Sequence, residues 1–144
     1  GHPDSPASIA QRSDLLEFGL AKAAPRAYAM AGVGPNDMDL AEIYDCFTFE
    51  VIQQLEEAGF CKRGEGGAFV ENGGIELGGR LPVNPSGGLA CFGEAVPAQA
   101  LAQVCELTWQ LRGTADGRQV DGARVGITAN QGLFGHGSSV IVKK

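Results

Sequence analysis

The sequence predicts an α/β domain in which a layered, mixed β-sheet is covered by helices. Apolar residues recur at helical spacing in three segments, and three shorter segments have the composition of buried strands. Their order along the chain is helix, strand, helix, loops, helix, strand, strand. The predicted helices are 14–31, 45–58 and 97–111, and the predicted strands are 40–44, 124–129 and 139–142.

Length and charge limit the classes of protein that fit. The chain has 144 residues, 44% hydrophobic and 19% charged, which is typical of one compact domain. We divide it into a flexible lead-in, 1–13, and a folded domain, 14–144. A net charge of −6 without runs of lysine or arginine argues against nucleic-acid binding. No apolar run approaches the roughly 20 residues that span a bilayer, and no signal peptide is visible, so we predict a cytoplasmic protein without membrane contact.

The cysteines and glycines match no metal or nucleotide motif. The four cysteines form no C-x-x-C pair and have no zinc-like spacing with the two histidines. No glycine cluster has the pattern of a phosphate-binding loop. We therefore expect free thiols, no metal site and no bound cofactor.

The predicted helices have recognisable starts and stops. The first contains Pro25, which a helix tolerates only in its first turn or at a kink, and Gly32 follows it as a stop. In the second, Asp45 is the expected N-cap residue, which places Cys46 in the first turn. The helix dipole would lower the pKa of the Cys46 thiol there, so we expect this cysteine to be reactive.

The third helix is expected to turn an apolar stripe toward the core and to stop at Gly113. This stripe consists of Val96, Ala100, Leu101, Val104, Leu107 and Leu111.

Residues 84–94, just before that helix, combine a Pro-Ser-Gly-Gly turn, a further glycine and a carboxylate. Glycines used in this way let a backbone come close to another strand or to a ligand. Gly87, Gly88 and Gly93 therefore serve tight turns or contact a substrate through their N–H groups. Glu94 is either a solvated loop residue or, if it lines a pocket, a general acid or base.

Four stretches carry motifs: Tyr-Asp-Cys-Phe at 44–47, Val-Asn-Pro-Ser-Gly-Gly at 83–88, Gly-Glu-Ala at 93–95 and Asn-Gln-Gly at 130–132. They stand where the H-D-C-F, V-N-x-x-G-G, G-H-P and C-x-G motifs stand in one protein family. The chain thereby resembles the C-terminal half of a thiolase, most nearly the sterol-carrier-protein type and its lipid-transfer and aldolase-like relatives.

The resemblance implies a thiolase-like C-terminal domain without the N-terminal half that holds the family's nucleophilic cysteine. It implies an acyltransferase that makes or breaks carbon–carbon bonds in acyl-CoA thioesters, with coenzyme A as a substrate rather than a cofactor. A homodimer, and a small OB-fold partner protein, are further expectations from the family. The 144-residue chain alone should be inactive.

The resemblance also implies the site residues, with three departures from the family pattern. Tyr44 replaces an asparagine or histidine of the oxyanion hole, Glu94 replaces the G-H-P histidine, and Asn130 replaces a second catalytic cysteine, whereas Cys46 matches the subfamily's acid/base cysteine. We predict Tyr44, Cys46 and Glu94 as catalytic residues. The predicted substrate-binding residues are Asn84, Gly87, Gly88, Gly93, Asn130 and His136.

Other interpretations of the same residues remain open. Tyr44 and Cys46 are alternatively ordinary core residues, and His136 a structural or surface histidine. For the whole protein, the alternatives to acyl transfer are a retro-aldolase acting on a β-hydroxyacyl-CoA and a catalytically silent subunit that binds acyl-CoA or lipid.

Overall fold

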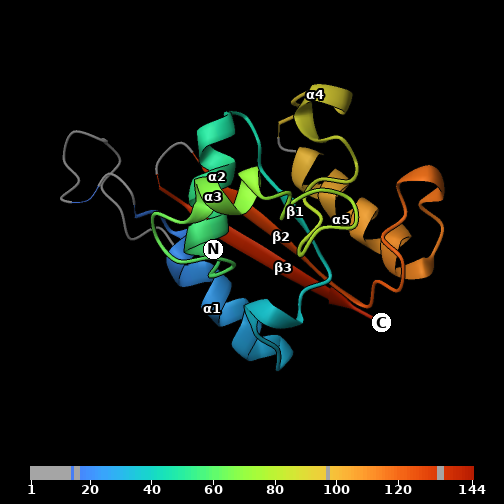
Figure 1. Cartoon of the computed structure of the whole chain (residues 1–144), viewed down its shortest axis with the longest axis horizontal. Coiled ribbons are helices and arrows are strands. Elements are labelled where there is room, and N and C mark those ends of the chain that lie inside the picture. The colour runs from blue at the N-terminus through green and yellow to red at the C-terminus, as the bar shows by residue number, and fades with distance from the viewer. Residues whose placement is uncertain (1–13, 15–16, 97, 133–134) are drawn as a thin grey trace.

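The computed structural model describes residue 14 and residues 17–96, 98–132 and 135–144 (Figure 1). The predicted lead-in, 1–13, lies outside these residues. The elements are α1 (Leu20–Ala31), η2 (Pro35–Asp37), β1 (Leu40–Ile43), α2 (Thr48–Glu57), α3 (Gly66–Glu71), α4 (Gly88–Phe92), α5 (Ala98–Arg112), η3 (Asp116–Arg118), β2 (Val125–Gln131) and β3 (Gly137–Lys143).

The three strands form one sheet in the order β1-β2-β3. The sheet is mixed, as the sequence predicts. β1 pairs with β2 in parallel, with Ile43 opposite Ala129, and β2 pairs with β3 in antiparallel. Because β1 and β2 run in parallel, the segments that follow them leave the sheet at the same edge. The predicted site stretches 44–47 and 130–132 therefore lie near one another.

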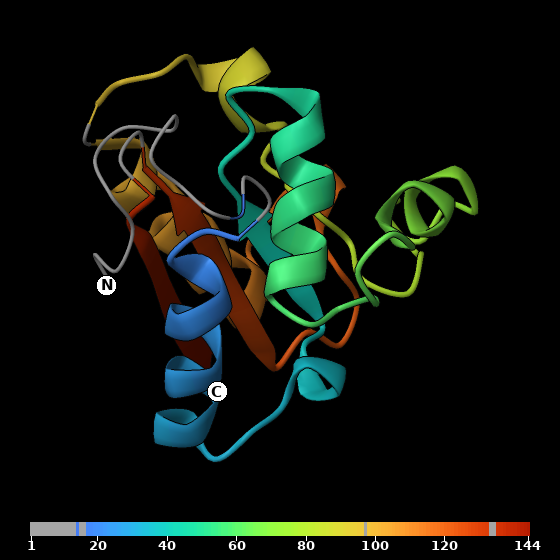
Figure 2. The same ribbon diagram turned by 90° about the vertical axis from the view of Figure 1, so that its left-hand side faces the viewer.

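One face of the sheet packs against α1 and α2, which lie side by side in Figure 2. The centre of this contact is apolar: Ala41, Ile43 and Ile127 of the sheet meet Leu20 and Leu55 of the helices. Each of these five residues is at most 1% exposed. Two glutamines of α2, Gln53 and Gln54, are buried as well. Alternation along the strands thus assigns the odd-numbered positions of β1 and β2 to the main hydrophobic core.

The opposite face of the sheet is covered by α5. Leu40 and Leu107 pack there at Gly126, where a Cβ atom would stand 2.7 Å from the Leu107 side chain. A side chain at this position would push α5 away from the sheet. Glu42 and Thr128 follow on the same face, at the even-numbered positions.

The helices differ in several details from those predicted. α1 begins at Leu20 rather than at residue 14, and Pro25 lies inside it, beyond the first turn. It ends as predicted at Gly32, whose φ of 67° is the left-handed conformation that glycine favours. The glycine-rich middle contains two short helices, α3 and α4, that the sequence did not predict. Their lengths of 6 and 5 residues are too short to show a helical period.

The apolar stripe predicted for α5 is only partly right. Leu107 and Leu111 are buried, but Leu101 is 69% exposed, and Val96, just before the helix, is 72% exposed. The buried face of α5 consists of Gln103, Glu106, Leu107, Gln110 and Leu111. The apolar pattern failed because three of these five inward-facing residues are polar.

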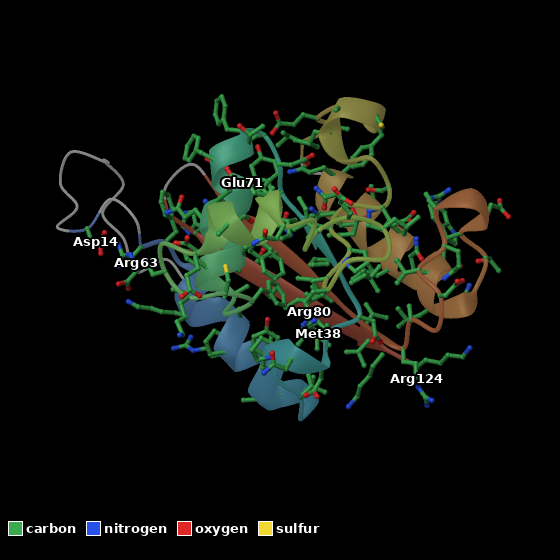
Figure 3. The ribbon with its side chains drawn as sticks, viewed as in Figure 1. Asp14, Met38, Arg63, Glu71, Arg80 and Arg124 are labelled. Carbon is green, nitrogen blue, oxygen red and sulfur yellow. The ribbon has the colours of Figure 1, made fainter. Side chains whose placement is uncertain are left out.

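An exposed ion pair joins two loops at the surface. Arg63, after α2, contacts both carboxylate oxygens of Asp14, at 2.9 and 3.0 Å, and the pair lies at the opposite end of the molecule from Arg124 (Figure 3). This pair holds the segment before α1 close to the end of α2.

Candidate active site

The candidate site begins where β1 ends. Tyr44, the residue after the strand, donates its backbone N–H to the carbonyl of Ala129 at 2.9 Å. Its own carbonyl accepts a 2.6 Å hydrogen bond from the buried Gln54 side chain of α2. Both backbone groups of Tyr44 are thus engaged, and the side chain lies on the same side of the sheet as Glu42.

Asn84 fixes the peptide just before Tyr44. Its amide oxygen accepts from the N–H of Ile43 at 2.6 Å, and its amide nitrogen donates to the carbonyl of Ile43 at 2.9 Å. The Asn84 backbone has a φ of 49°, a conformation that asparagine tolerates better than most residues. The side chain predicted to bind substrate therefore acts in this structure as a clamp on the strand end.

The turn at 85–88 is attached to the same strand by a carboxylate. The Ser86 hydroxyl donates to Glu42 at 2.8 Å, and the Ser86 N–H approaches the other Glu42 oxygen at 3.4 Å. The Ser86 hydroxyl also accepts a 3.3 Å hydrogen bond from the N–H of Gly88, the first residue of α4. The Glu42 side chain thereby joins the strand to both the side chain and the backbone of Ser86 in the turn.

Asp45 was predicted as the N-cap residue of the second helix, and this prediction is wrong. α2 begins at Thr48, with Phe47 in the N-cap position. Asp45 instead accepts the backbone N–H of Leu89 in α4 at 3.1 Å. A Cβ atom at Gly88 would lie 2.0 Å from the Asp45 carboxylate, so this helix start needs glycine. A carboxylate can cap a helix from a distant segment, which local sequence does not reveal.

Tyr44 and Glu94, 50 residues apart in the sequence, meet through their side chains. The Tyr44 hydroxyl donates a hydrogen bond to a Glu94 carboxylate oxygen. This bond, and then burial, raises the pKa of Tyr44 above its ordinary value. Glu94 itself is exposed, so the pair lies at the surface of this chain, where a substrate or another segment has access to it.

Cys46 is placed beside this pair, but the expected lowering of its pKa is wrong. It lies two residues before the first residue of α2. Its thiol donates to the carboxylate of Glu50 at 3.0 Å. Burial, together with this hydrogen bond, raises the pKa of Cys46 to about 11. At neutral pH the sulfur is therefore a protonated thiol that can donate a proton, and not a thiolate.

The remaining predicted residues are more loosely connected with Tyr44. Asn130 donates to Gln103 of α5 at 2.8 Å. His136 accepts the N–H of Gly132 with its backbone carbonyl at 2.8 Å, in the loop between β2 and β3. A Cβ atom at Gly93 would meet no atom within 4 Å, but its φ of 76° suits glycine. The residues between Gly132 and Gly135 lie outside the described part of the chain.

Sequence reasoning missed three residues of this arrangement: Glu42, Glu50 and Ser86. Glu42 could have been found from the sequence, because it is the one charged residue in a four-residue strand that is buried throughout. A carboxylate at such a position needs partners, and the serine of the glycine turn supplies them. Glu50 could have been found as well, because it follows Cys46 by four residues, the spacing at which side chains on a helix meet.

Two further classes of feature do not occur in the described residues. Across 14, 17–96, 98–132 and 135–144, histidines, cysteines and carboxylates do not gather in groups of three that would hold a metal ion. Within the same part of the chain, none of the helices has the length and apolarity needed to cross a membrane.

Comparison with known proteins gives consistent matches. The family described as thiolase C-terminal domain-like matches residues 1–144. An acetyl-CoA acetyltransferase of Methanothermobacter thermautotrophicus is 46% identical over 92% of this chain and 35% of its own length. Sterol carrier protein 2 of Rattus norvegicus is 42% identical over 92% of this chain and 25% of its own. This chain therefore spans only about a third or less of these relatives.

A solved structure shares the fold. A chain of the Ltp2-ChsH2(DUF35) aldolase superposes with a TM-score of 0.80 and 31% sequence identity. The match covers 92% of this chain and 34% of that one.

Proposed function

Because the chain belongs to the family of thiolase C-terminal domains, we propose that the whole protein makes or breaks a carbon–carbon bond next to an acyl-CoA thioester. Relatives named acetyl-CoA acetyltransferase and a structural neighbour named aldolase both support chemistry of this kind. The chain covers 35% of the acetyltransferase, so the assignment concerns the protein as a whole. Coenzyme A enters as part of the substrate.

Within this chemistry, the site favours retro-aldol cleavage of a β-hydroxyacyl-CoA. The observation that supports it is the hydrogen bond from the Tyr44 hydroxyl to the Glu94 carboxylate. A thiolase-type oxyanion site stabilises negative charge on the thioester oxygen, and a carboxylate at that point would repel it. A retro-aldol reaction instead needs a base that removes the proton of the β-hydroxyl group, and a carboxylate next to a phenol suits this task.

In the proposed step, Glu94 takes the proton of the β-hydroxyl group and the Cα–Cβ bond breaks. The electron pair of that bond passes to the thioester as an enolate while the β-carbon becomes a carbonyl. The Tyr44 hydroxyl, released from Glu94 as that carboxylate gains a proton, donates a hydrogen bond to the enolate oxygen. The Cys46 thiol, protonated at neutral pH, gives a proton to the α-carbon. Solvent then reprotonates Cys46 and takes up the proton of Glu94, which restores the starting state.

Acyl transfer is the second candidate. It is favoured by the position of Cys46 beside Tyr44 and by the acetyltransferase name of the 46% identical relative. In that reaction the acyl group would be accepted by a nucleophile outside this chain, and Cys46 would move protons as acid and base. The raised pKa of Cys46 suits the acid role better than the base role.

We propose two kinds of partner for the whole protein. The structural neighbour is named as Ltp2 together with ChsH2(DUF35), which supports a second protein that assembles with this one. We infer that this partner is a small OB-fold protein and that the whole protein is a homodimer, as the family resemblance implies. Co-expression followed by size-exclusion chromatography with light scattering tests both assemblies.

The decisive experiment offers the full-length protein, with its partner, two substrates in separate reactions. One reaction contains a β-hydroxyacyl-CoA, the other a β-ketoacyl-CoA with free coenzyme A, and mass spectrometry follows the products. We expect cleavage of the hydroxyacyl substrate to a carbonyl compound and a shorter acyl-CoA. Cleavage of only the ketoacyl substrate would establish acyl transfer instead. Binding of both without turnover would establish a silent acyl-CoA-binding subunit.

A further inference from the structure

Glu94 stands on a segment that the sheet does not hold directly. Residues 90–96 are all exposed, and Figure 1 shows α4 at the periphery of the molecule, away from the strands. In α4 itself only Gly88 is buried. The position of Glu94 relative to Tyr44 therefore depends on the contacts that fix the start of α4.

Two carboxylates supply these contacts, and both come from the end of β1. Asp45 accepts the Leu89 N–H, and Glu42 holds Ser86, whose hydroxyl in turn accepts the Gly88 N–H. Tyr44 lies between these two carboxylates in the sequence. The same strand end thus fixes both members of the Tyr44–Glu94 pair.

Resting on the proposed function, we propose that Glu42 is a positioning residue: its buried carboxyl group holds Ser86, and through the turn at 85–88 it places Glu94 within hydrogen-bond distance of Tyr44. Glu42 does not touch the reacting atoms in this role. It acts through Ser86 and the start of α4.

Among the described residues, no basic side chain forms an ion pair with the Glu42 carboxylate. Glu42 is 1% exposed on a strand that is otherwise apolar. The nearest charged groups include Asp45 and, on α5, Glu106, which repel a negative charge on Glu42. Arg118 attracts a negative charge on Glu42 from a distance, but its guanidinium group is engaged in a bidentate pair with Glu106 at 2.9 to 3.1 Å. Within the described part of the chain, Ser86 donates two hydrogen bonds to the Glu42 carboxyl group, so contact with the turn is what this group gains.

The geometry makes a distinction that can be tested. A glutamine at position 42 can accept the Ser86 N–H with its oxygen and donate to the Ser86 hydroxyl with its nitrogen. A leucine fills similar space but makes neither bond. Hydrogen bonding rather than charge is therefore expected to decide the effect, and Glu42→Gln should preserve what Glu42→Leu loses.

The test measures turnover of the β-hydroxyacyl-CoA by full-length variants. We expect Glu42→Leu and Ser86→Ala each to lower kcat roughly 10-fold with KM changed less than about 3-fold, and Glu42→Gln to remain within about 3-fold of the original protein. Because both variants break the same contact, the double variant should be no slower than the slower single one. Thr114→Ala, which removes an exposed hydroxyl bonded to Trp109, is the matched control and should leave kcat unchanged.

A second measurement does not depend on activity. Amide hydrogen exchange of the peptide 85–94 should become at least about 10-fold faster in Ser86→Ala and Glu42→Leu, but not in Glu42→Gln or Thr114→Ala. Ser86 lies in a partly exposed turn, so Ser86→Ala remains informative if Glu42→Leu does not fold. Unchanged exchange in Ser86→Ala, additive losses of kcat, or failure of Glu42→Gln to preserve turnover would overturn the inference. Absence of turnover in the original protein would overturn the proposed function alone, because hydrogen exchange would still report on the turn.

Discussion

The two faces of the sheet differ in the polarity of their buried side chains. On the α1 and α2 side, Ala41, Ile43 and Ile127 pack against leucines and alanines in a mostly apolar core, which also contains the buried glutamines Gln53 and Gln54 of α2. On the α5 side, the buried residues include Glu42, Thr128, Gln103, Glu106 and Gln110. Glu106 and Gln110 bond to each other and to residues 118–120, Gln103 bonds to Asn130, Thr128 to strand β3, and Glu42 to the turn. Side chains on one face of the same strands thus stabilise the fold, and those on the other face position polar groups.

The difference locates the chemistry. Burying a polar group costs free energy unless it is hydrogen-bonded, so a face rich in buried polar side chains is retained where those bonds fix something. Of these side chains, the buried Glu42 fixes the turn at 85–88, while the half-buried Asn84 and Asp45 beside it fix the strand end at Tyr44 and the start of α4. On this interpretation, substitutions on the apolar face should change stability and leave the reaction intact, whereas substitutions at the edge of the polar face should do the reverse.

The largest effect is expected from Glu94→Gln in the full-length protein. The amide keeps the size of the side chain but cannot take a proton, so kcat should fall about 100-fold to 1,000-fold while substrate binding changes little. Steady-state kinetics with the β-hydroxyacyl-CoA and a thermal melt of the same sample check the result. Glu71→Gln, at an exposed residue of α3, is the control. Unchanged turnover in Glu94→Gln would remove this residue from the mechanism.

The sequence predicts the apolar face of the sheet better than the polar face. The apolar face follows from alternation along the strands and from helical spacing, and the mixed sheet, the stop at Gly32 and the stop at Gly113 were predicted correctly. The polar face did not follow, because the partners of Glu42 and Asp45 lie 44 residues away. Local patterns suggested Asp45 as the cap of the nearest helix, whereas it caps a five-residue helix that no pattern predicted. The motif resemblance brought Tyr44 and Glu94 to notice, but only the structure joins them.

On the apolar face, Leu55→Ala is expected to cost more stability than any other substitution proposed here. Leu55 is 0% exposed and belongs to the main core, so its truncation leaves a cavity that costs about 3 to 4 kcal/mol of unfolding free energy. The folded fraction should retain the original kcat. Met30→Ala, at a residue that is 90% exposed, should change the free energy by less than about 0.5 kcal/mol. Denaturant titration measures both, and equal effects of the two would contradict the assignment of the core.

On the polar face, Arg118→Ala tests whether the network also stabilises. It removes a bidentate partner from Glu106, which is 3% exposed at its side chain, whereas Arg118 is 40% exposed. Leaving a buried carboxylate with fewer partners should cost about 2 to 3 kcal/mol. The matched control is Arg63→Ala, which breaks the exposed pair with Asp14 and should leave stability almost unchanged. A loss no larger for Arg118→Ala than for Arg63→Ala would mean that the network contributes little to the fold.

The smallest effect expected is a pH dependence of stability that Glu42→Gln reduces. Burial raises the pKa of Glu42 to about 7 from an ordinary value of 4.5, so the folded protein binds more protons than the unfolded chain between these values. Stability therefore falls as the pH rises through this window, and above pH 7 the ionised carboxylate costs about 1 to 2 kcal/mol after relaxation is allowed for.

Glu42→Gln keeps the contacts with Ser86 without this cost, so it should be more stable than the original protein at pH 8 and similar at pH 4.5. Burial also raises the pKa of Glu57, on the apolar face, to about 7, so Glu57→Gln serves as the comparison and part of the slope should persist in Glu42→Gln. Chemical denaturation at several pH values decides the matter: a variant that is less stable than the original protein at pH 8 would show that the charge on Glu42, rather than its hydrogen bonds, holds the turn.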